Sequence, residues 1–408
     1  MRSLLIFAAL MAVLCAKSFK MNVLSTGSLR AKLITSGQYP KHLDRNRRHQ
    51  MQNFRKGSLP IADYADEFYV GEVQVGTPGQ RTQLVMSTGV TGSWLIDSNC
   101  NSDACNGVSV NGFTRHKFNT LNSSTFQLED EGFAILYGYG VCEGYMATDV
   151  FSFAGFNIAG QDVGMALYVN NYFGNLAIDG MFSLAWLAFE VNNESTPLRQ
   201  AFDDLSKPIF TVWLDKKVNI NAGGNPGLFT FGEFDQDHCE EDVNYVLLTD
   251  DVHWQFSIDG YSISSHEKLT KAEVILCNEL NTTFPLMKIQ AISDTGTSWI
   301  GASQEVVDTV ANITGASYDA SRDIYTVRCD SSETLPDFNI LINGKEYAIP
   351  SAVYVVDIGL NNGNCVITFF SMSANGFGPS WVLGATFIRS FCHVYDVGAK
   401  QIGFSRAR

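Results

Sequence analysis

The sequence SDTGTSW at residues 293–299 decides the fold of this chain, and a near copy, MSTGVTGSW, lies at residues 86–94. Each is a tight turn after apolar residues, and its glycine permits the sharp backbone. Two such turns that face each other bring two carboxylates together, which share a proton so that one acts as base and the other as acid. The later copy supplies Asp294, but the earlier copy has Ser87 in the matching place.

The chain also repeats itself beyond the two turns. The first turn is followed by MFS at residues 181–183 and the second by VLG at residues 382–384, so each half has a turn and then two apolar residues with a small one. A repeat of this length predicts two lobes of like fold, because solenoid repeats are much shorter. Related lobes meet face to face at a cleft, which is a common place for a binding site.

From Asp63 onward the chain has the texture of a β protein. Short runs rich in Val, Ile, Phe, Tyr and Thr are separated by Gly, Asn and Asp, which predicts strands and turns. The clearest runs are residues 68–75, 83–86, 133–139 and 148–156. Helical patches are few and short, at residues 197–206 and 304–313, with one or two short helices expected within residues 29–48.

The first residues have the pattern of a secretory signal. A charged start, an apolar run over residues 4–14 and a small residue at Ala16 predict a signal peptide at residues 1–16. A transmembrane anchor is the alternative, but about 13 apolar residues fall short of the roughly 20 that cross a bilayer. We therefore expect export to an extracellular or endolysosomal lumen, with no membrane span in the mature chain.

Charge is spread unevenly along the 408 residues. Residues 1–60 hold 11 of the 28 Lys and Arg but only one acid, Asp44, so the remainder has a net charge of −24. This pattern predicts a detachable basic segment on an acidic body, and an ordinary solvated tail is the alternative. A nucleic-acid partner is excluded, since the chain is exported and its body repels phosphate.

Eight of the nine cysteines remain after the signal is removed. An even number in an exported chain favours disulfides, but their pairing stays open at this level. The chain has no C-x-x-C pair and no histidines spaced as in H-E-x-x-H, which argues against zinc. Four Asn-x-Ser/Thr acceptors predict glycosylation, at Asn122, Asn193, Asn281 and Asn312.

The sequence resembles the pepsin and cathepsin D family of aspartic proteases, and in pattern its nematode members. The resemblance covers residues 69–407 and rests on YVGEVQVGTP at 69–78, DTGTS at 294–298 and WVLGATFIR at 381–389. It implies an all-β, bilobal fold with lobes at residues 61–245 and 246–408. The basic segment at residues 17–60 is then a prosegment, which occupies the cleft in zymogens. The resemblance also implies a peptide or protein in the cleft, no cofactor, no metal and a monomeric chain.

The same resemblance assigns residues of the cleft. Tyr137 matches the tyrosine of the flap, the hairpin that closes over substrate, and Trp94 matches the tryptophan that this tyrosine hydrogen-bonds. Thr297 and Ser298 match positions that contact substrate or support the second aspartate. The remaining assigned positions are glycines of the flap and of the two turns, namely Gly138, Gly140, Gly89 and Gly296.

Three disulfides are implied in the same way. Cys100 with Cys105 matches a small loop disulfide, Cys329 with Cys365 matches a bridge of the second lobe, and Cys239 with Cys392 matches an extra bridge of nematode members. Cys142 and Cys277 have no assigned partner.

The first turn departs from the family pattern at three positions. Ser87 stands where the first catalytic aspartate belongs, Val90 where a hydroxyl residue usually bonds that aspartate, and Ser183 where a glycine packs beneath it. The second turn is intact around Asp294. Without a like-charged neighbour, Asp294 is expected to titrate near the free value of about 3.9.

Two functional interpretations follow. Because a hydroxyl is no base in acid, the chain is predicted to have lost normal peptidase activity while its cleft still holds peptide. The alternative is an acid endopeptidase with residual or atypical catalysis through Asp294. Catalysis with Ser87 as nucleophile requires a histidine or lysine base, and neither turn contains one.

Overall fold

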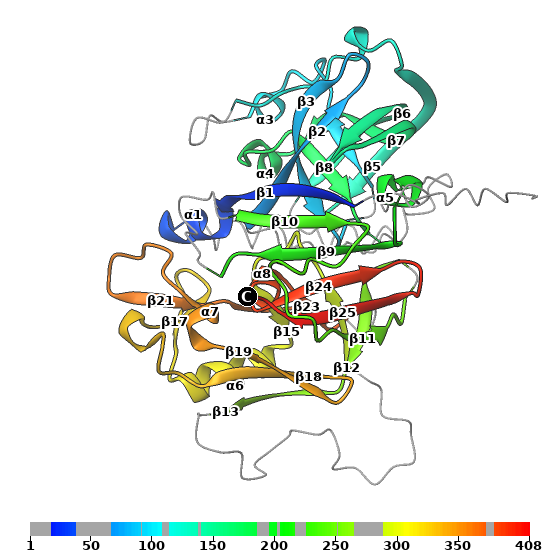
Figure 1. Ribbon diagram of the computed structural model, residues 1–408. Coiled ribbons are helices and arrows are strands. Elements are labelled where there is room, and N and C mark those ends of the chain that lie inside the picture. Colours follow the sequence, from blue (N-terminus) through cyan, green and yellow to red (C-terminus); the bar gives the residue numbers. More distant parts are fainter. Residues whose placement is uncertain are drawn as a thin grey trace, which may run out of the picture.

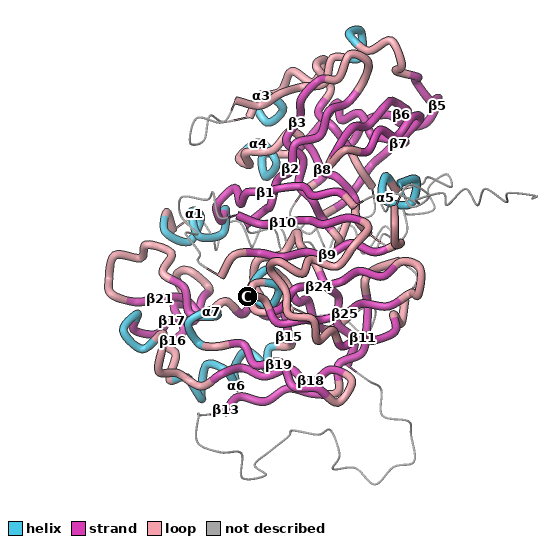
Figure 2. Tube along the Cα trace, in the orientation of Figure 1, coloured by secondary structure: helices cyan, strands magenta, loops and turns pink. Residues whose placement is uncertain are grey.

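A computed structural model describes residues 18–37, 67–90, 92–107, 114–137, 140–185, 196–201, 205–216, 226–250, 252–264, 289–372 and 379–408. Figures 1 and 2 show a strand-rich molecule of two lobes, with β1, β10 and β9 lying between them. The predicted all-β, bilobal fold is therefore confirmed. The signal peptide and residues 38–60 of the basic segment lie outside the described residues.

One long sheet runs through the first lobe and across the junction. In the described part of the chain it has 13 strands, in the order β11-β25-β24-β9-β10-β1-β2-β3-β8-β4-β7-β6-β5, with β2 also paired to β6. Its junction strands are β1 (Phe19–Ser28), β9 (Ile209–Leu214), β10 (Pro226–Phe231), β11 (Asn244–Leu247), β24 (Phe391–Asp396) and β25 (Gln401–Arg406). Its first-lobe strands are β2 (Glu67–Val75), β3 (Gln80–Ser87), β4 (Trp94–Ile96), β5 (Gln127–Leu136), β6 (Val141–Phe153), β7 (Phe156–Val169) and β8 (Gly180–Ser183).

Three smaller sheets build the second lobe from described residues. The first contains β12 (Gln255–Ile258), β14 (Ile289–Ser293), β23 (Trp381–Leu383), β15 (Ile300–Ala302) and β22 (Phe369–Ser371). The second contains β13 (Gly260–Ser264), β18 (Asp337–Ile342) and β19 (Lys345–Ile349). The third contains β16 (Ser317–Asp319), β17 (Ile324–Arg328), β21 (Asn364–Ile367) and β20 (Val355–Val356).

Helices are short in the described residues, as predicted. They are α1 (Leu29–Thr35), α3 (Asp103–Asn106), α4 (Asn171–Gly174), α5 (Pro197–Ala201), α6 (Gln304–Thr314), α7 (Ser351–Tyr354) and α8 (Ala385–Ile388), with 3-10 turns η1 (Thr120–Asn122) and η3 (Cys329–Ser331). The helix predicted at 304–313 is confirmed by α6, and α5 covers the first part of the helix predicted at 197–206, of which residues 202–204 lie outside the described residues. The strand predicted over 148–156 is confirmed up to Phe153 in β6, but Ala154 and Gly155, with φ of 48° and 95°, turn the chain into β7, which begins at Phe156.

The first described residues belong to the body of the fold. Strand β1 lies between β10 and β2, and its alternate side chains Met21 and Val23 are buried. Helix α1 follows at once and buries Ala31 and Ile34 in an apolar cluster with second-lobe residues, including Trp299. One helix of the predicted 29–48 region is thus present.

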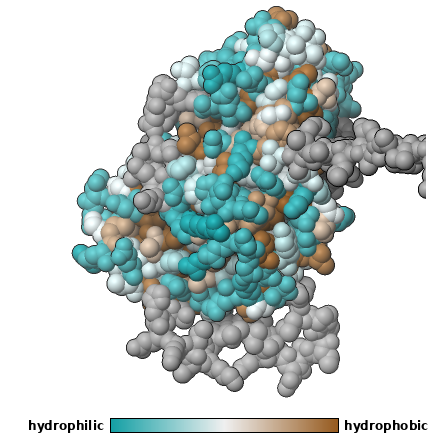
Figure 3. Space-filling model, viewed as in Figure 1, coloured by the Kyte–Doolittle hydropathy of each residue, from teal (hydrophilic) through white to brown (hydrophobic). Residues whose placement is uncertain are grey.

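The three implied disulfides are present: Cys100–Cys105, Cys239–Cys392 and Cys329–Cys365. Cys142 is a buried free thiol, and Cys277 lies outside the described residues. No helix of the described chain is long and apolar enough to cross a membrane. The face in Figure 3 is mainly hydrophilic, with smaller apolar areas on both lobes.

Candidate active site

Both turns sit on the same local strand pattern. In the first lobe, β3 runs parallel to β8, with Ser87 opposite Ser183, and β8 pairs antiparallel with β4. In the second lobe, β14 runs parallel to β23, with Ser293 opposite Leu383, and β23 pairs antiparallel with β15. The repeat seen in the sequence is therefore a structural repeat, and each turn emerges between two strands that fix its direction.

Side chains from each turn bind the backbone of the other. The Thr88 hydroxyl donates to the Ser293 carbonyl (3.0 Å) and accepts from the Thr295 N–H (3.0 Å). The Thr295 hydroxyl donates to the Met86 carbonyl (2.7 Å) and accepts from the Thr88 N–H (3.0 Å). All four bonds are buried, so this reciprocal arrangement fixes the two turns against each other.

The threonine clamp formed by these bonds of Thr88 and Thr295 brings Ser87 and Asp294 face to face. The Ser87 hydroxyl lies 3.4 Å from Asp294 Oδ1, and the two side chains are 1% and 4% exposed, so neither projects freely into solvent. Gly89 and Gly296 allow this approach. A Cβ on Gly89 would lie 2.5 Å from the Asp294 carboxyl carbon, and a Cβ on Gly296 would lie 2.7 Å from Ser87 Oγ.

Asp294 keeps a full set of donors. Its Oδ1 accepts from the Gly296 N–H (2.8 Å) and its Oδ2 from the Thr297 hydroxyl (2.7 Å). Burial nevertheless raises the pKa of Asp294 above its ordinary value of 3.8, although these bonds act in the opposite direction. The expectation that this carboxyl titrates like a free aspartate is therefore wrong. Loss of a like-charged neighbour does not remove the cost of burying the charge itself.

Among its described residues, the first turn has no equivalent hydroxyl support. Val90 is buried and offers only an apolar side chain where Thr297 donates in the second turn. The Ser87 hydroxyl instead accepts a 3.3 Å bond from the Gly89 N–H. The two turns share a backbone frame but differ in the chemistry that they hold.

Ser183 also alters the first turn. Its hydroxyl donates to the Val90 carbonyl (2.6 Å), so the extra atoms are accommodated by a new hydrogen bond. At the matching place in the second lobe, a Cβ on Gly384 would lie 2.2 Å from the Thr297 carbonyl oxygen. The two lobes therefore differ in backbone as well as in side chains beneath the turns.

The predicted flap residues meet beside the first turn. The Trp94 indole N–H donates to the Tyr137 hydroxyl (2.6 Å), and both rings pack edge-on against Phe173. Tyr137 is 3% exposed and lies between β5 and β6. Gly140 also packs against Phe173, since an added Cβ would lie 2.5 Å from that ring. Gly138 lies outside the described residues.

Other predicted residues lie around this centre. Ser298 is buried, and its carbonyl accepts from the backbone and side chain of Thr386. Asn122 and Asn312 are exposed, as glycosylation requires, whereas Asn193 and Asn281 lie outside the described residues.

His253, which belongs to no motif of the sequence, lies near the second turn. The residue after it, Trp254, accepts from the Ser293 N–H (3.1 Å) and donates its indole N–H to the Leu184 carbonyl (2.8 Å), which places this segment against both lobes' turns. His253 and Asp294 interact electrostatically, and burial lowers the pKa of the imidazole. The interaction between His253 and Asp294 joins two segments that share no sequence motif, so it is visible only in the folded structure. No hydrogen bond joins Ser87 to a histidine among the described residues.

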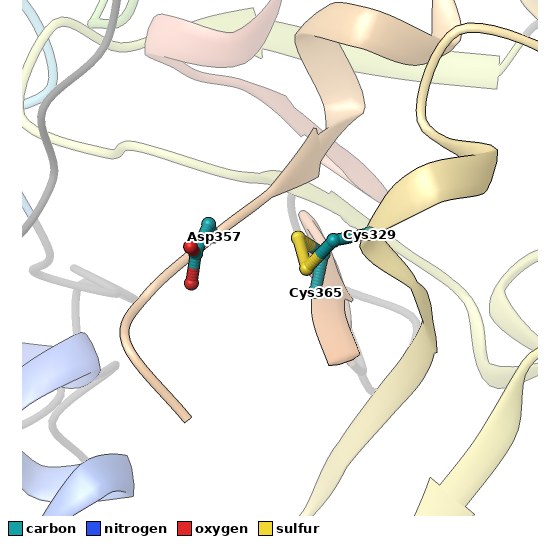
Figure 4. A group of neighbouring side chains, drawn as sticks. All are labelled: Cys329, Asp357 and Cys365. Atoms are coloured by element: carbon teal, nitrogen blue, oxygen red, sulfur yellow. A yellow bond between two sulfur atoms is a disulfide. The ribbon is translucent and has the colours of Figure 1, made fainter. Parts of the chain in front are cut away.

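One cluster outside the cleft contains metal-type ligands. Cys329, Asp357 and Cys365 lie together, but the two sulfurs are bonded to each other, as Figure 4 shows. A metal binds the thiolate form of cysteine, which a disulfide does not offer. The two cysteines therefore form a cross-link of the second lobe.

Comparison with known proteins agrees with this geometry. A family model described as eukaryotic aspartyl protease matches residues 68–407. The chain is 38% identical over 404 residues to Aspartic protease 1 of Caenorhabditis elegans, with 98% of each chain covered. It is 27% identical over 414 residues to gastricsin of Oryctolagus cuniculus, with 99% of each chain covered. The chain belongs to the eukaryotic aspartyl protease family.

Proposed function

We propose that this chain is a pepsin-like protein that holds peptide in its cleft and does not cut it at a normal rate. The observation that carries the proposal is the facing pair of Ser87 and Asp294, in which one carboxylate is opposed by a hydroxyl. The relatives are named as aspartic proteases and gastricsin, so a peptide is the ligand class that the family suggests.

The chemical argument concerns the proton. A water molecule that attacks a peptide carbonyl must lose a proton to a base, and the leaving amine must gain one from an acid. Ser87 is neutral throughout the acid range, so Asp294 alone would have to do both. Loss of one positioned acid–base group costs about 10² to 10⁴ in rate.

A second candidate is residual catalysis through Asp294. This carboxyl keeps its donors from Gly296 and Thr297, and burial raises its pKa above the ordinary value. The surroundings of Asp294 are intact, so slow peptide hydrolysis by this single carboxyl is the alternative that an activity assay has to distinguish from complete loss of activity.

We further propose export to an extracellular or endolysosomal lumen. The signal-like residues 1–16, the three disulfides and the exposed acceptors Asn122 and Asn312 support this location. The basic residues 17–60 serve as a prosegment. If its removal depends on the chain's own activity, an inactive site leaves it attached.

A paired assay tests the proposal. The protein and its Ser87→Asp variant are compared at pH 3 to 5 on a mixed peptide library, after forced removal of residues 17–60. We expect cleavage only from the variant. Equal cleavage by both proteins, blocked by a statine-type inhibitor, would contradict the inactive reading and support residual catalysis.

A further inference from the structure

A second polar group lies directly beneath the Asp294 turn. Ser293, the last residue of β14, places its hydroxyl 2.6 Å from His393 Nδ1 and 2.7 Å from the Tyr395 hydroxyl. His393 and Tyr395 lie two residues apart on β24, so they project on the same side of that strand. All three side chains are 1% exposed or less.

This group is continuous with the clamp between the turns. The Tyr395 hydroxyl also hydrogen-bonds the Thr88 side chain. Thr88 in turn donates to the Ser293 carbonyl and accepts from the Thr295 N–H. One buried network therefore joins the C-terminal strand β24 to both turns, and Ser293 is its junction.

The imidazole has little to stabilise a positive charge. It packs edge-on against the rings of Phe387 (5.2 Å between centroids) and Phe404 (4.9 Å), and Val212 is its register partner on β9. Its Nε2 atom has no hydrogen-bond partner in the described part of the chain. A protonated ring would bury a second N–H without an acceptor, which is costly in an apolar setting.

Titratable groups near the ring do not offset this cost. Tyr395 is the titratable residue in its network, and burial raises the pKa of that phenol. Asp294 follows Ser293 in the chain, yet burial alone accounts for the shift of His393, whose pKa falls from 6.5 to about 3. The ring is therefore neutral in mild acid.

We propose that His393, Tyr395 and Ser293 form an acid-sensitive support, which positions the Asp294 turn against Thr88 only while the imidazole is neutral. In mild acid the support holds and the cleft keeps its shape. In strong acid a proton on His393 breaks the balance of donors and acceptors at Ser293 and loosens the joint between the lobes. This role does not depend on whether the cleft cuts peptide.

The support has a measurable effect on stability. Between pH 6.5 and about 3 the unfolded chain protonates this histidine and the folded chain does not. Stability from this group is thus fully present above pH 6.5 and is lost as the pH falls. The folding equilibrium constant drops by about tenfold for each pH unit in this window.

Denaturant unfolding of the full chain at pH 7, 5 and 4 tests the proposal. His393→Asn keeps a polar atom near the Nδ1 position and cannot take up a proton. The fall of its folding equilibrium constant with pH should therefore be smaller than that of the unmodified chain, by about tenfold per pH unit. The matched control is His238→Asn, at a side chain 35% exposed and bonded to Asp235, which should follow the unmodified chain. Acid loss in His393→Asn equal to that of the unmodified chain would overturn the proposal.

A second measurement applies if His393→Asn does not fold. In the unmodified chain with ¹³C-labelled histidine, the ring that shows contacts to Phe387 and Phe404 protons identifies His393. We expect this ring to stay neutral from pH 7.5 to pH 4. A titration of that ring with a midpoint above pH 5 would overturn the support.

Discussion

At the scale of single residues, the two turns share a backbone frame but carry different side chains. Both turns are placed by the same strands and the same threonine clamp, yet Asp294 receives a hydroxyl from Thr297 and position 87 receives none from Val90. Restoring the carboxylate at position 87 therefore restores charge without its full set of donors. The proposed loss of activity therefore depends on the hydrogen-bond donors around position 87 as well as on the absent carboxylate.

This asymmetry predicts an order among repaired variants. Ser87→Asp should cut peptides slowly, and Ser87→Asp with Val90→Thr should be faster by about ten- to a hundredfold, because a hydrogen bond to a charged group is worth about 1.5 to 3 kcal/mol. Initial rates on one peptide at pH 4 measure the difference.

The matched control is Thr297→Val in the Ser87→Asp background, which removes the equivalent hydroxyl from the other turn. It should lower the rate by a similar factor. Equal rates with and without the threonine at position 90 would show that the hydroxyl is not what the first turn lacks.

The raised pKa of Asp294 marks a limit of sequence reasoning at this scale. The sequence shows the missing neighbour and so suggests an ordinary aspartate. It does not show that the surviving carboxyl is 4% exposed, and burial decides the direction of the shift. The environments of His253 and His393 could not be predicted for the same reason, because they are formed by strands that are distant in the sequence.

At the scale of elements, a buried hydrogen bond joins the predicted flap residue Tyr137 to Trp94. Tyr137→Phe would leave the Trp94 indole N–H without its 2.6 Å acceptor beside Phe173. We expect a loss of about 1 to 3 kcal/mol in the free energy of unfolding, measured with urea.

Tyr168→Phe, at a residue of β7 that is 47% exposed, serves as control and should change stability by less than about 0.5 kcal/mol. Equal effects of the two changes would show that the Trp94 bond does not fix the flap.

The strand ends beneath the turns give a second element-scale prediction. Gly384→Ala brings a Cβ to 2.2 Å from the Thr297 carbonyl and 2.5 Å from the Trp299 carbonyl, and backbone atoms cannot yield cheaply. Its cost should exceed about 2 kcal/mol.

Ser183→Gly loses only the bond to Val90 and adds chain flexibility, so about 1 to 2 kcal/mol is expected. Calorimetric unfolding of both variants measures these costs. Similar losses in the two variants would contradict the difference between the lobes.

Helices and strands could be predicted where a single periodic pattern of apolar residues covers the whole element. Helix α6 has apolar residues at helical spacing, ends at Thr314 and is capped by Gly315 in the left-handed region, so its existence follows from local sequence. The end of β6 was predicted three residues too late, because phenylalanines lie on both sides of the Ala154–Gly155 turn and one β-type run therefore continues through it in the sequence.

At the scale of the whole molecule, the N-terminal segment is part of the central sheet. Strand β1 pairs with β10 and β2, and α1 packs on the second lobe, so residues 18–37 contact both halves. The sequence predicted a basic segment on an acidic body, but it did not predict that β1 lies between β10 and β2. Pairing between strands far apart in the sequence produces no local sequence pattern.

An inactive site predicts that this segment stays attached. N-terminal sequencing of the protein isolated from its source should find a start near Lys17. A start near Asp63 would show removal. A second assay on that shortened form would then decide whether the chain or another protease made the cut.

The central claim is that Asp294 faces a hydroxyl and does not turn over peptide bonds. The most direct measurement compares the intact chain with its Asp294→Asn variant, each incubated at pH 4 with a peptide library in ¹⁸O water. Every hydrolysed bond gains ¹⁸O, which mass spectrometry counts. We predict the same background incorporation for both proteins. Incorporation by the intact chain above that of Asp294→Asn would contradict the account, because it would show that the single carboxyl still cuts.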